Sequence, residues 1–515
     1  MQQPRFTYRN TIRITFCSLL LLFAAWMGTS CSEDDKFTND PSVHLVFETD
    51  TVRFDTVFTS IGSSTKRFKV YNHHKDGLRI ASVLLGSGGT SGFRINIDGH
   101  SGTFISDLEI LGNDSLFVFA EVTVNPQDSD SPVFVRDSIL FNLENGIRQQ
   151  IILEAYGQDV IIMRGETFSA DTLLNARRPY LIYDSLVVAA NARLEIAAGT
   201  TLCFHNHAYL GVHGQIDCQG SQEEPVVMRG DRTDRMFPYL PYDRLDAQWG
   251  GVRLYPESKD NRFDYVDIHS GSWGIDCPLS TSDETKCTIR NSVIHNVAGD
   301  ALHLFNCSAK VQNSQISNAL GNCVTIIGGM CEFVHTTIAQ FYPWNGLHGS
   351  AVYFANVQND TIYPLLGANF YNCLITGSST DEITGYPSEK PGMFRALFKN
   401  CLINIALSGN EPDSLLQIFA ASVNETEKLN QKKPKLTQAE REEVVWGAKN
   451  FRLLDYDNFI YDFDLDSISP ARGIGSDSYV SECTTDRLGR SRPTSKPDAG
   501  CYQYTPLKTQ NQDEQ

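Results

Sequence analysis

The chain has 515 residues, of which 41% are hydrophobic and 20% charged, and its formal net charge is −18 at pH 7. This length predicts two or three domains, or one domain joined to a long solenoid. The acidic balance argues against nucleic acid and against broad contact with anionic lipid, and it disfavours a long polyanionic substrate such as pectate.

The first residues, 1–30, are expected to be a signal peptide. Three arginines precede an almost unbroken apolar run over 14–26, which is too short to span a bilayer comfortably. Small residues at 28–30 then lead to Cys31. This end resembles a lipobox, although Gly28 stands where leucine is commoner, and the resemblance implies cleavage before Cys31 and lipidation of its thiol. The alternative is an ordinary secretory signal followed by an unrelated cysteine.

Residues 31–42 are interpreted as a lipid anchor and an acidic linker. The sequence Ser-Glu-Asp-Asp-Lys at 32–36 resembles the tag that follows the lipidated cysteine in Bacteroidota surface lipoproteins. The resemblance implies attachment to the outer membrane through Cys31, with the protein facing the cell exterior. The alternative is a solvated acidic linker with no targeting role.

Residues 43–159 are predicted to form an Ig-like β-sandwich. Hydrophobic and polar residues alternate in short segments, most clearly over 116–124 and 139–143, and turns rich in Gly, Asn and Asp separate them. A period of two is typical of strands with one buried face. The pattern resembles the Ig-like modules placed beside membrane anchors in bacterial surface proteins, which implies a spacer role.

An internal repeat predicts a parallel β-helix. Six segments between 263 and 403 share an apolar first position, an Asn-like third position and isoleucine at the sixth. The third-position residues are Tyr265, Asn291, Asn313, His335, Asn372 and Asn400. Their spacings of 26, 22, 22, 37 and 28 residues indicate a coil of about 22 residues with insertions. Stacked coils place equivalent residues in columns, so we expect an isoleucine column in the core and an asparagine column that hydrogen-bonds along a turn.

Residues 166–410 are assigned to this β-helix. Alternating apolar residues and glycine turns over 186–227 fit its first coils. Together with Trp-Gly-Gly-Val at 249–252, they resemble the right-handed parallel β-helix family that includes pectate-lyase-like proteins. The predicted fold class is therefore all-β, with an N-terminal Ig-like β-sandwich followed by a right-handed parallel β-helix.

Residues 411–505 break the repeat and are predicted to form a C-terminal cap, followed by a disordered tail over 506–515. Thr437 and Glu440 form a capping box that predicts a short helix. Segments between 469 and 500 look like the closing motif of many bacterial β-helix proteins. A cap is expected because open β-edges invite aggregation.

The chain has thirteen cysteines. Cys17 lies in the predicted signal peptide and Cys31 is the proposed anchor, so eleven remain and at least one thiol must be free within a single chain. No CxxC motif is present, which leaves zinc and redox motifs unsupported. Cys483 and Cys501 are candidates for a disulfide bridge, whereas most of the others are predicted to stack in the core.

The first candidate binding site is an acidic insertion. It contains Asp231, Asp234, Asp243 and Asp246, interleaved with three arginines. Carboxylates are the ligands that Ca²⁺ takes, and they also hydrogen-bond to sugars. The alternative, which we favour, is a solvated loop whose charges neutralise one another, so that the protein has no cofactor.

The second candidate is His269 with His295, which occupy equivalent positions in adjacent coils with Asp267 nearby. Neighbouring strands lie about 4.8 Å apart, so two outward imidazoles at this spacing could bind a metal or act as acid and base. The alternative is an exposed pair without a role.

The third candidate is the insertion after Ile338, which carries Tyr342 and Trp344. Aromatic side chains on a loop beside a β-helix groove are suited to stacking on sugars. They could equally pack the loop against its own coil.

Two functions from different classes remain. The first is a non-enzymatic surface module whose β-helix binds glycan, matrix or another protein. The second is a carbohydrate-active enzyme, a polysaccharide lyase or glycoside hydrolase, on the same scaffold. Such enzymes need a basic residue or paired carboxylates on one outer face. The sequence does not show these on neighbouring coils, so no catalytic residue is assigned and the first function is favoured. Convergence of two carboxylates, or of a carboxylate cluster with an arginine, in one groove would reverse that preference.

Overall fold

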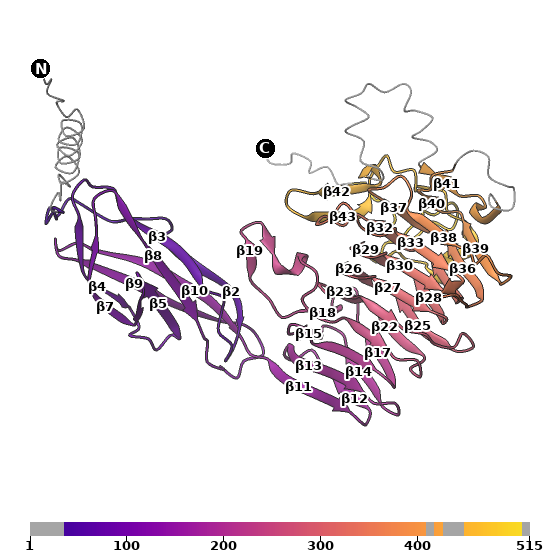
Figure 1. The fold of residues 1–515 in the computed structure, drawn as a ribbon, viewed down its shortest axis with the longest axis horizontal. Helices are drawn as coiled ribbons and strands as arrows, with labels where there is room; N and C mark the ends of the chain where they lie inside the picture. The colour runs from indigo at the N-terminus through magenta and orange to yellow at the C-terminus, as the bar shows by residue number, and fades with distance from the viewer. Residues whose placement is uncertain (1–34, 408–416, 426–447, 507–515) are drawn as a thin grey trace, which may run out of the picture. The chain divides into compact units, whose positions relative to one another are not determined.

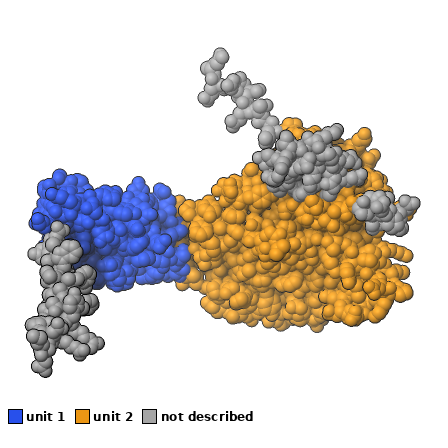
Figure 2. All heavy atoms as spheres, turned by 45° about the horizontal axis from the view of Figure 1, so that its top comes forward, with its two compact units in different colours: residues 1–54, 62–124, 134–155 blue, residues 55–61, 125–133, 156–515 orange. Residues whose placement is uncertain are grey.

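The computed structural model describes residues 35–407, 417–425 and 448–506. The predicted signal peptide, Cys31 and the capping-box helix at 437–445 lie outside these residues. The chain divides into two compact units, one of residues 1–54, 62–124 and 134–155, the other of 55–61, 125–133 and 156–515 (Figure 2). No helix in the described part is long and apolar enough to cross a membrane.

The first unit consists of two five-stranded sheets (Figure 1). One has the order β1 (Val46–Phe47), β3 (Lys66–Asn72), β8 (Asp114–Val122), β5 (Phe93–Ile97), β6 (His100–Gly102). The other has the order β2 (Thr51–Phe58), β10 (Arg148–Gln158), β9 (Val133–Leu143), β4 (Leu78–Leu85), β7 (Phe104–Ile110).

The two sheets pack face to face through aromatic side chains. The ring centroids of Phe47 and Phe141 lie 5.2 Å apart, and those of Phe54 and Phe93 lie 5.7 Å apart. Each aromatic pair joins one sheet to the other. Within the sheets, β3 is antiparallel to β8 and β4 is antiparallel to β7. This arrangement is a β-sandwich, and its Ig-like character stays a prediction.

The second unit is built on two parallel sheets of eighteen and nine strands. The larger contains β11 (Ile161–Phe168), β13 (Tyr180–Val188), β15 (Thr201–Phe204), β16 (Tyr209–Val212), β18 (Val226–Gly230), β21 (Val252–Leu254), β23 (Val266–His269), β24 (Ile275–Cys277), β26 (Val293–Val297), β27 (Leu302–Phe305), β29 (Gln315–Ala319), β30 (Val324–Ile327), β32 (Thr337–Gln340), β33 (Val352–Ala355), β37 (Leu374–Gly377), β38 (Ile383–Tyr386), β40 (Leu402–Ile403) and β41 (Val423–Asn424). The smaller contains β12 (Thr172–Leu174), β14 (Arg193–Ala197), β17 (Gln215–Gln219), β22 (Asn261–Asp264), β25 (Thr285–Arg290), β28 (Ser308–Gln312), β31 (Gly329–Val334), β36 (Leu365–Tyr371) and β39 (Phe394–Lys399).

Each coil supplies three short strands, as β25, β26 and β27 illustrate. β25 pairs with β22 and β28, β26 with β23 and β29, and β27 with β24 and β30. All of these pairings are parallel, and each joins a strand to its equivalents in the preceding and following coils. The predicted all-β fold with a parallel β-helix is therefore confirmed.

The isoleucine column predicted from the repeat fills the core. The six residues follow one another in register through β23, β26, β29, β32, β37 and β40, and each is at most 1% exposed. They are Ile268, Ile294, Ile316, Ile338, Ile375 and Ile403. Because every second side chain of a strand points to the same face, the residues on either side of each isoleucine point outward. This alternation directs Asp267, His269 and His295 away from the core.

The third-position residues form the expected turn column. Asn313 donates a hydrogen bond to Asn291 (2.7 Å), and Asn372 lies 3.0 Å from the imidazole of His335. All six have a positive φ, between 47° and 54°. Asparagine tolerates this left-handed conformation better than other residues with a side chain, which explains why four of the six positions carry it.

Replacing Asn291 with alanine is expected to lower the free energy of unfolding by about 1–2 kcal/mol. Alanine disfavours the φ of 51° at this position and removes the bonds to Asp264 and Asn313. Urea unfolding measures this decrease. Glycine accepts the same φ, so Asn291→Gly should recover the part of the decrease that is due to the backbone conformation. Equal losses in both variants would contradict a role for the left-handed turn.

The C-terminal region covers the end of the core and also lies along the side of the coils. Ile418 and Phe419, in the helical turn η2 (Gln417–Phe419), pack against the main core, where the ring centroid of Phe419 lies 5.3 Å from that of Phe398. Residues 451–504 follow the side of the coils, where Ser476 and Arg492 hydrogen-bond to members of the turn column. They include the hairpin β42 (Phe451–Asp455) and β43 (Ile460–Leu465), and the turn η5 (Asp477–Glu482).

The remaining elements are short. The hairpins β19 (Arg235–Phe237) with β20 (Leu240–Pro241), and β34 (Val357–Gln358) with β35 (Thr361–Ile362), project from the coils, and the helical turns η1 (Tyr242–Arg244) and η4 (Ala448–Asn450) complete the described elements.

The cysteines of the described residues are all free and buried, so the candidate bridge between Cys483 and Cys501 is not formed. Cys501 packs with Leu374 and Phe451 in the hydrophobic cluster beneath the C-terminal region, and Cys483 does not belong to that cluster. The two thiols therefore have separate surroundings. Cys287 and Cys331 lie in the main core, as the column argument predicted.

Candidate functional site

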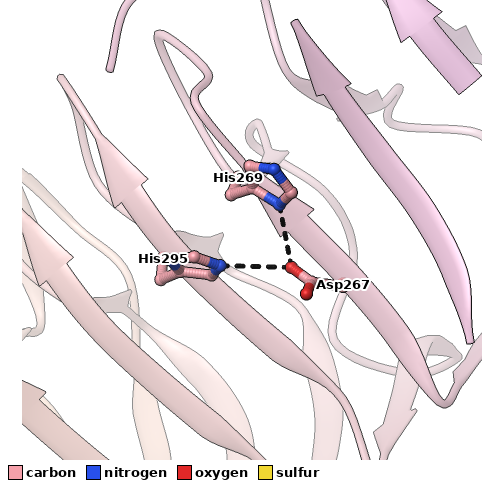
Figure 3. Close-up of side chains that lie close together, drawn as sticks. All are labelled: Asp267, His269 and His295. Atoms are coloured by element: carbon pink, nitrogen blue, oxygen red, sulfur yellow. Dashed lines mark hydrogen bonds and ion pairs between the residues drawn. The ribbon is translucent and has the colours of Figure 1, made fainter. Parts of the chain in front are cut away.

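Asp267, His269 and His295 meet on the outer surface of the β-helix (Figure 3). The first two come from β23, on either side of the buried Ile268, and His295 is paired with His269 in the neighbouring strand β26. One oxygen of Asp267, Oδ1, lies 2.9 Å from Nδ1 of His269 and 3.2 Å from Nε2 of His295. The two imidazole centroids are 5.0 Å apart. The structure thus brings together the histidine pair that the sequence singled out.

A second carboxylate faces the other nitrogen of His269. Asp243, in η1 of the acidic insertion, places Oδ1 3.6 Å from Nε2 of His269. Asp243 also forms an ion pair with Arg229, which lies in β18, the strand beside β23. His269 therefore lies between two carboxylates, and one of them is held by an arginine.

These charges alter the acid–base properties of the cluster. Burial by itself would lower the pKa of His269, but the negative charges of Asp267 and Asp243 and their hydrogen bonds outweigh it and raise the pKa to about 9. Burial would raise the pKa of Asp267, yet the two histidines lower it well below its usual range. At neutral pH the pair is therefore an imidazolium and a carboxylate.

The cluster is only partly exposed to solvent. The side chain of His269 is 10% exposed, that of His295 24%, that of Asp267 31% and that of Asp243 43%. A metal ion can be shared by three or more His, Cys, Asp or Glu side chains whose ligand atoms lie close together. Among the described residues, Asp267, His269 and His295 form the one such group.

The four aspartates proposed as a calcium site contact different partners. Asp231 lies 2.6 Å from His205, and both carboxylate oxygens of Asp234 accept hydrogen bonds from Arg232. Asp246 accepts a hydrogen bond from Tyr342, and Asp243 joins the histidine cluster. In the described part of the chain, only Asp234 is paired with an arginine of the same insertion, and the four carboxylates have separate partners.

The two candidate stacking residues lie against other parts of the protein. Tyr342 is only 8% exposed, and its hydroxyl is bound by Asp246. Trp344 stacks on Phe459 of the β42–β43 hairpin with ring centroids 4.2 Å apart. Both side chains therefore contact other segments of the chain: Tyr342 is buried, and Phe459 covers one face of the Trp344 ring.

A further polar group, which the sequence analysis missed, lies on the third strand of successive coils. Arg253, Asp276 and His303 are consecutive in register along β21, β24 and β27. Nδ1 of His303 lies 2.8 Å from Asp276 Oδ1, and Nε of Arg253 lies 3.5 Å from Asp276 Oδ2. The alternation of Ile275-Asp276-Cys277 with Leu302-His303-Leu304 carried this signal, but the six-residue repeat does not include the strands β21, β24 and β27.

Aromatic rings surround this polar row. The centroid of Trp273 lies 6.0 Å from His303, His303 lies 6.4 Å from Phe305, and Phe305 lies 4.7 Å from Tyr363. Trp273 is 40% exposed and the side chain of Arg253 51% exposed. We call these six residues, Arg253, Trp273, Asp276, His303, Phe305 and Tyr363, the aromatic face.

No family model matches the chain, and no curated protein sequence matches it. Among solved structures, the catalytic domain of a GH87 alpha-1,3-glucanase is 10% identical over 66% of this chain and 80% of that chain, with a TM-score of 0.18. Dex49A from Penicillium minioluteum is 10% identical over 73% of this chain and 70% of that chain, with a TM-score of 0.16. A family 123 glycoside hydrolase from Clostridium perfringens is 6% identical over 22% of this chain and 25% of that chain, with a TM-score of 0.16. TM-scores this low identify neither a substrate nor an activity.

Proposed function

We propose that this protein is a cell-surface lipoprotein, anchored at Cys31 in the outer membrane, whose β-helix binds a neutral glycan without cleaving it. The observation that carries the proposal is the aromatic face, where partly exposed rings adjoin an Arg253–Asp276–His303 row. The sandwich then serves as a spacer between the anchor and the β-helix. The anchor and the location rest on the sequence alone.

The chemistry of the aromatic face suits a sugar chain. Pyranose rings present apolar C–H faces that pack on aromatic rings, and their hydroxyls bond well to charged side chains. Equivalent side chains of neighbouring coils lie about 4.8 Å apart, so an extended glycan can contact several coils. The formal charge of −18 disfavours an anionic polysaccharide, so a neutral glycan is the ligand class that we propose.

A glycan array with purified residues 32–515 tests this proposal. We expect retention of at least one neutral glycan, and we expect Trp273→Ala to weaken its binding at least tenfold because the variant removes the most exposed ring of the face. Phe104→Ala is the matched control, since Phe104 is an exposed aromatic residue (62%) in the first unit. Failure to retain any glycan, or equal binding by all three proteins, would overturn the proposal.

A carbohydrate-active enzyme is the second candidate, and one observation favours it. Asp243 and Asp267 approach the two nitrogens of His269, and Arg229 is paired with Asp243. This convergence favours an enzyme, whereas the partly exposed rings of the separate aromatic face favour glycan binding. His269 is protonated at neutral pH and could donate a proton to a leaving group, while the carboxylates stabilise positive charge. Reducing-end and unsaturated-product assays on every glycan retained decide between the two functions. Turnover that disappears in His269→Gln would establish the enzyme.

A further inference from the structure

We propose that Asp267, His269 and His295 form a binding site for a divalent transition-metal ion, for which Zn²⁺ is the probe. The ligands would be Oδ1 of Asp267, Nδ1 of His269 and Nε2 of His295. This site lies on a different row of side chains from the aromatic face, so the inference is independent of glycan binding.

Two of the three separations between the ligand atoms, those from Asp267, are close to those that a metal requires. Zinc binds nitrogen at about 2.0–2.1 Å and carboxylate oxygen at about 2.0–2.2 Å, so two ligands of a tetrahedral site lie roughly 3.3–3.4 Å apart. Oδ1 of Asp267 is 2.9 Å from the ligand nitrogen of His269 and 3.2 Å from that of His295. The ligand atoms of all three residues lie within 4.8 Å of one another. Movements of a few tenths of an ångström in the two Asp267 contacts would therefore suit an ion.

The surroundings of His269 resemble those of a metal-bound histidine. A ligating imidazole commonly donates its second N–H to a carboxylate, which orients the ring and makes it a better ligand. In His269, Nδ1 faces Asp267, and Nε2 faces Asp243 at 3.6 Å. Arg229 holds that second carboxylate in turn. This outer partner is an observation separate from the three ligands, and it points to the same chemistry.

The ligands are held by rigid elements. His269 and His295 lie on paired strands, next to Ile268 and Ile294, which are each 1% exposed in the core. Ser317, the next residue of the row, is buried and ends the histidine column. Two imidazoles and one carboxylate favour zinc and its first-row neighbours over Ca²⁺ or Mg²⁺, which prefer all-oxygen sites. Three protein ligands also leave a fourth position for water or another ligand.

Isothermal titration of chelator-treated residues 32–515 with ZnCl₂ at pH 7 tests the site. We expect one ion per chain, with binding at least a hundredfold weaker in His295→Gln. Asp243→Asn should weaken it about 10–100-fold, because it removes the outer carboxylate and leaves the ligands in place. Titrations in buffers of different ionisation enthalpy should show proton release, since ligating imidazoles must be neutral.

His303→Gln is the matched control, because it removes a histidine that also contacts an aspartate but lies on the aromatic face. It should bind Zn²⁺ as the unaltered protein does. Circular dichroism of each variant verifies that the β-helix is folded, and Asp243→Asn remains informative if His295→Gln unfolds. The proposal would be overturned by the absence of zinc uptake, or by equal affinities in the unaltered protein, His295→Gln and Asp243→Asn. A loss of affinity in His303→Gln equal to that in His295→Gln would overturn it as well.

Discussion

Replacing Phe370 with alanine is expected to lower the free energy of unfolding by about 3–5 kcal/mol. Phe370 is fully buried between Phe333 and Phe398, the equivalent residues of the coils before and after it. Its ring centroid lies 4.7 Å from the first and 4.6 Å from the second, and both pairs are stacked. Alanine would leave a cavity inside this column, and paired strands on both sides prevent the backbone from collapsing into it.

Equilibrium unfolding in urea, followed by circular dichroism, measures this effect. Leu366→Ala is the control, because Leu366 lies on the same strand, β36, and is 36% exposed. It should cost less than about 1 kcal/mol, as substitutions at exposed positions usually do. Losses of similar size in the two variants would show that the aromatic column does not stabilise the β-helix as argued.

Raising the pH from 5 to 9 is expected to destabilise the protein through Glu382. This side chain is fully buried just before β38, and its two oxygens accept hydrogen bonds from the backbone N–H groups of Ser379 (2.8 Å) and Ala351 (3.0 Å). Burial, opposed by those two bonds and aided by Asp381, raises the pKa of Glu382 to about 8. In the unfolded chain the carboxyl ionises near its usual pKa of 4.5.

The folded protein therefore holds a proton that the unfolded chain has already lost. The resulting stability is fully present below pH 4.5 and is lost as the pH rises through about 8. At about 1.4 kcal/mol for each pKa unit, the total loss is at most about 5 kcal/mol.

Thermal unfolding between pH 5 and pH 9 measures this dependence. Glu382→Gln cannot ionise, so its unfolding temperature should fall less over this range than that of the unaltered protein. Glu389→Gln, at an exposed position nearby, should retain the full dependence. If Glu382→Gln and the unaltered protein show the same dependence on pH, another group is responsible.

Part of the candidate site was accessible from the sequence, since His269 and His295 occupy one position of the repeat and adjacent coils must bring them together. Asp243 was named for a different reason, as one of four aspartates in an insertion. Its place beside His269 depends on how that insertion folds back over the strands, and the repeat carries no information about this. The partners of Tyr342 and Trp344 depend in the same way on the packing of loops.

The sequence by itself determined the β-helix, its isoleucine and asparagine columns and the pairing of the two histidines. The reason is that a parallel stack converts a spacing along the chain directly into a contact between coils. Only the tertiary structure decided how the C-terminal region lies along the coils, which carboxylates surround His269, and how Arg253, Asp276 and His303 align beside Trp273. These contacts join segments that share no period, so their positions follow from side-chain packing and charge across the folded surface.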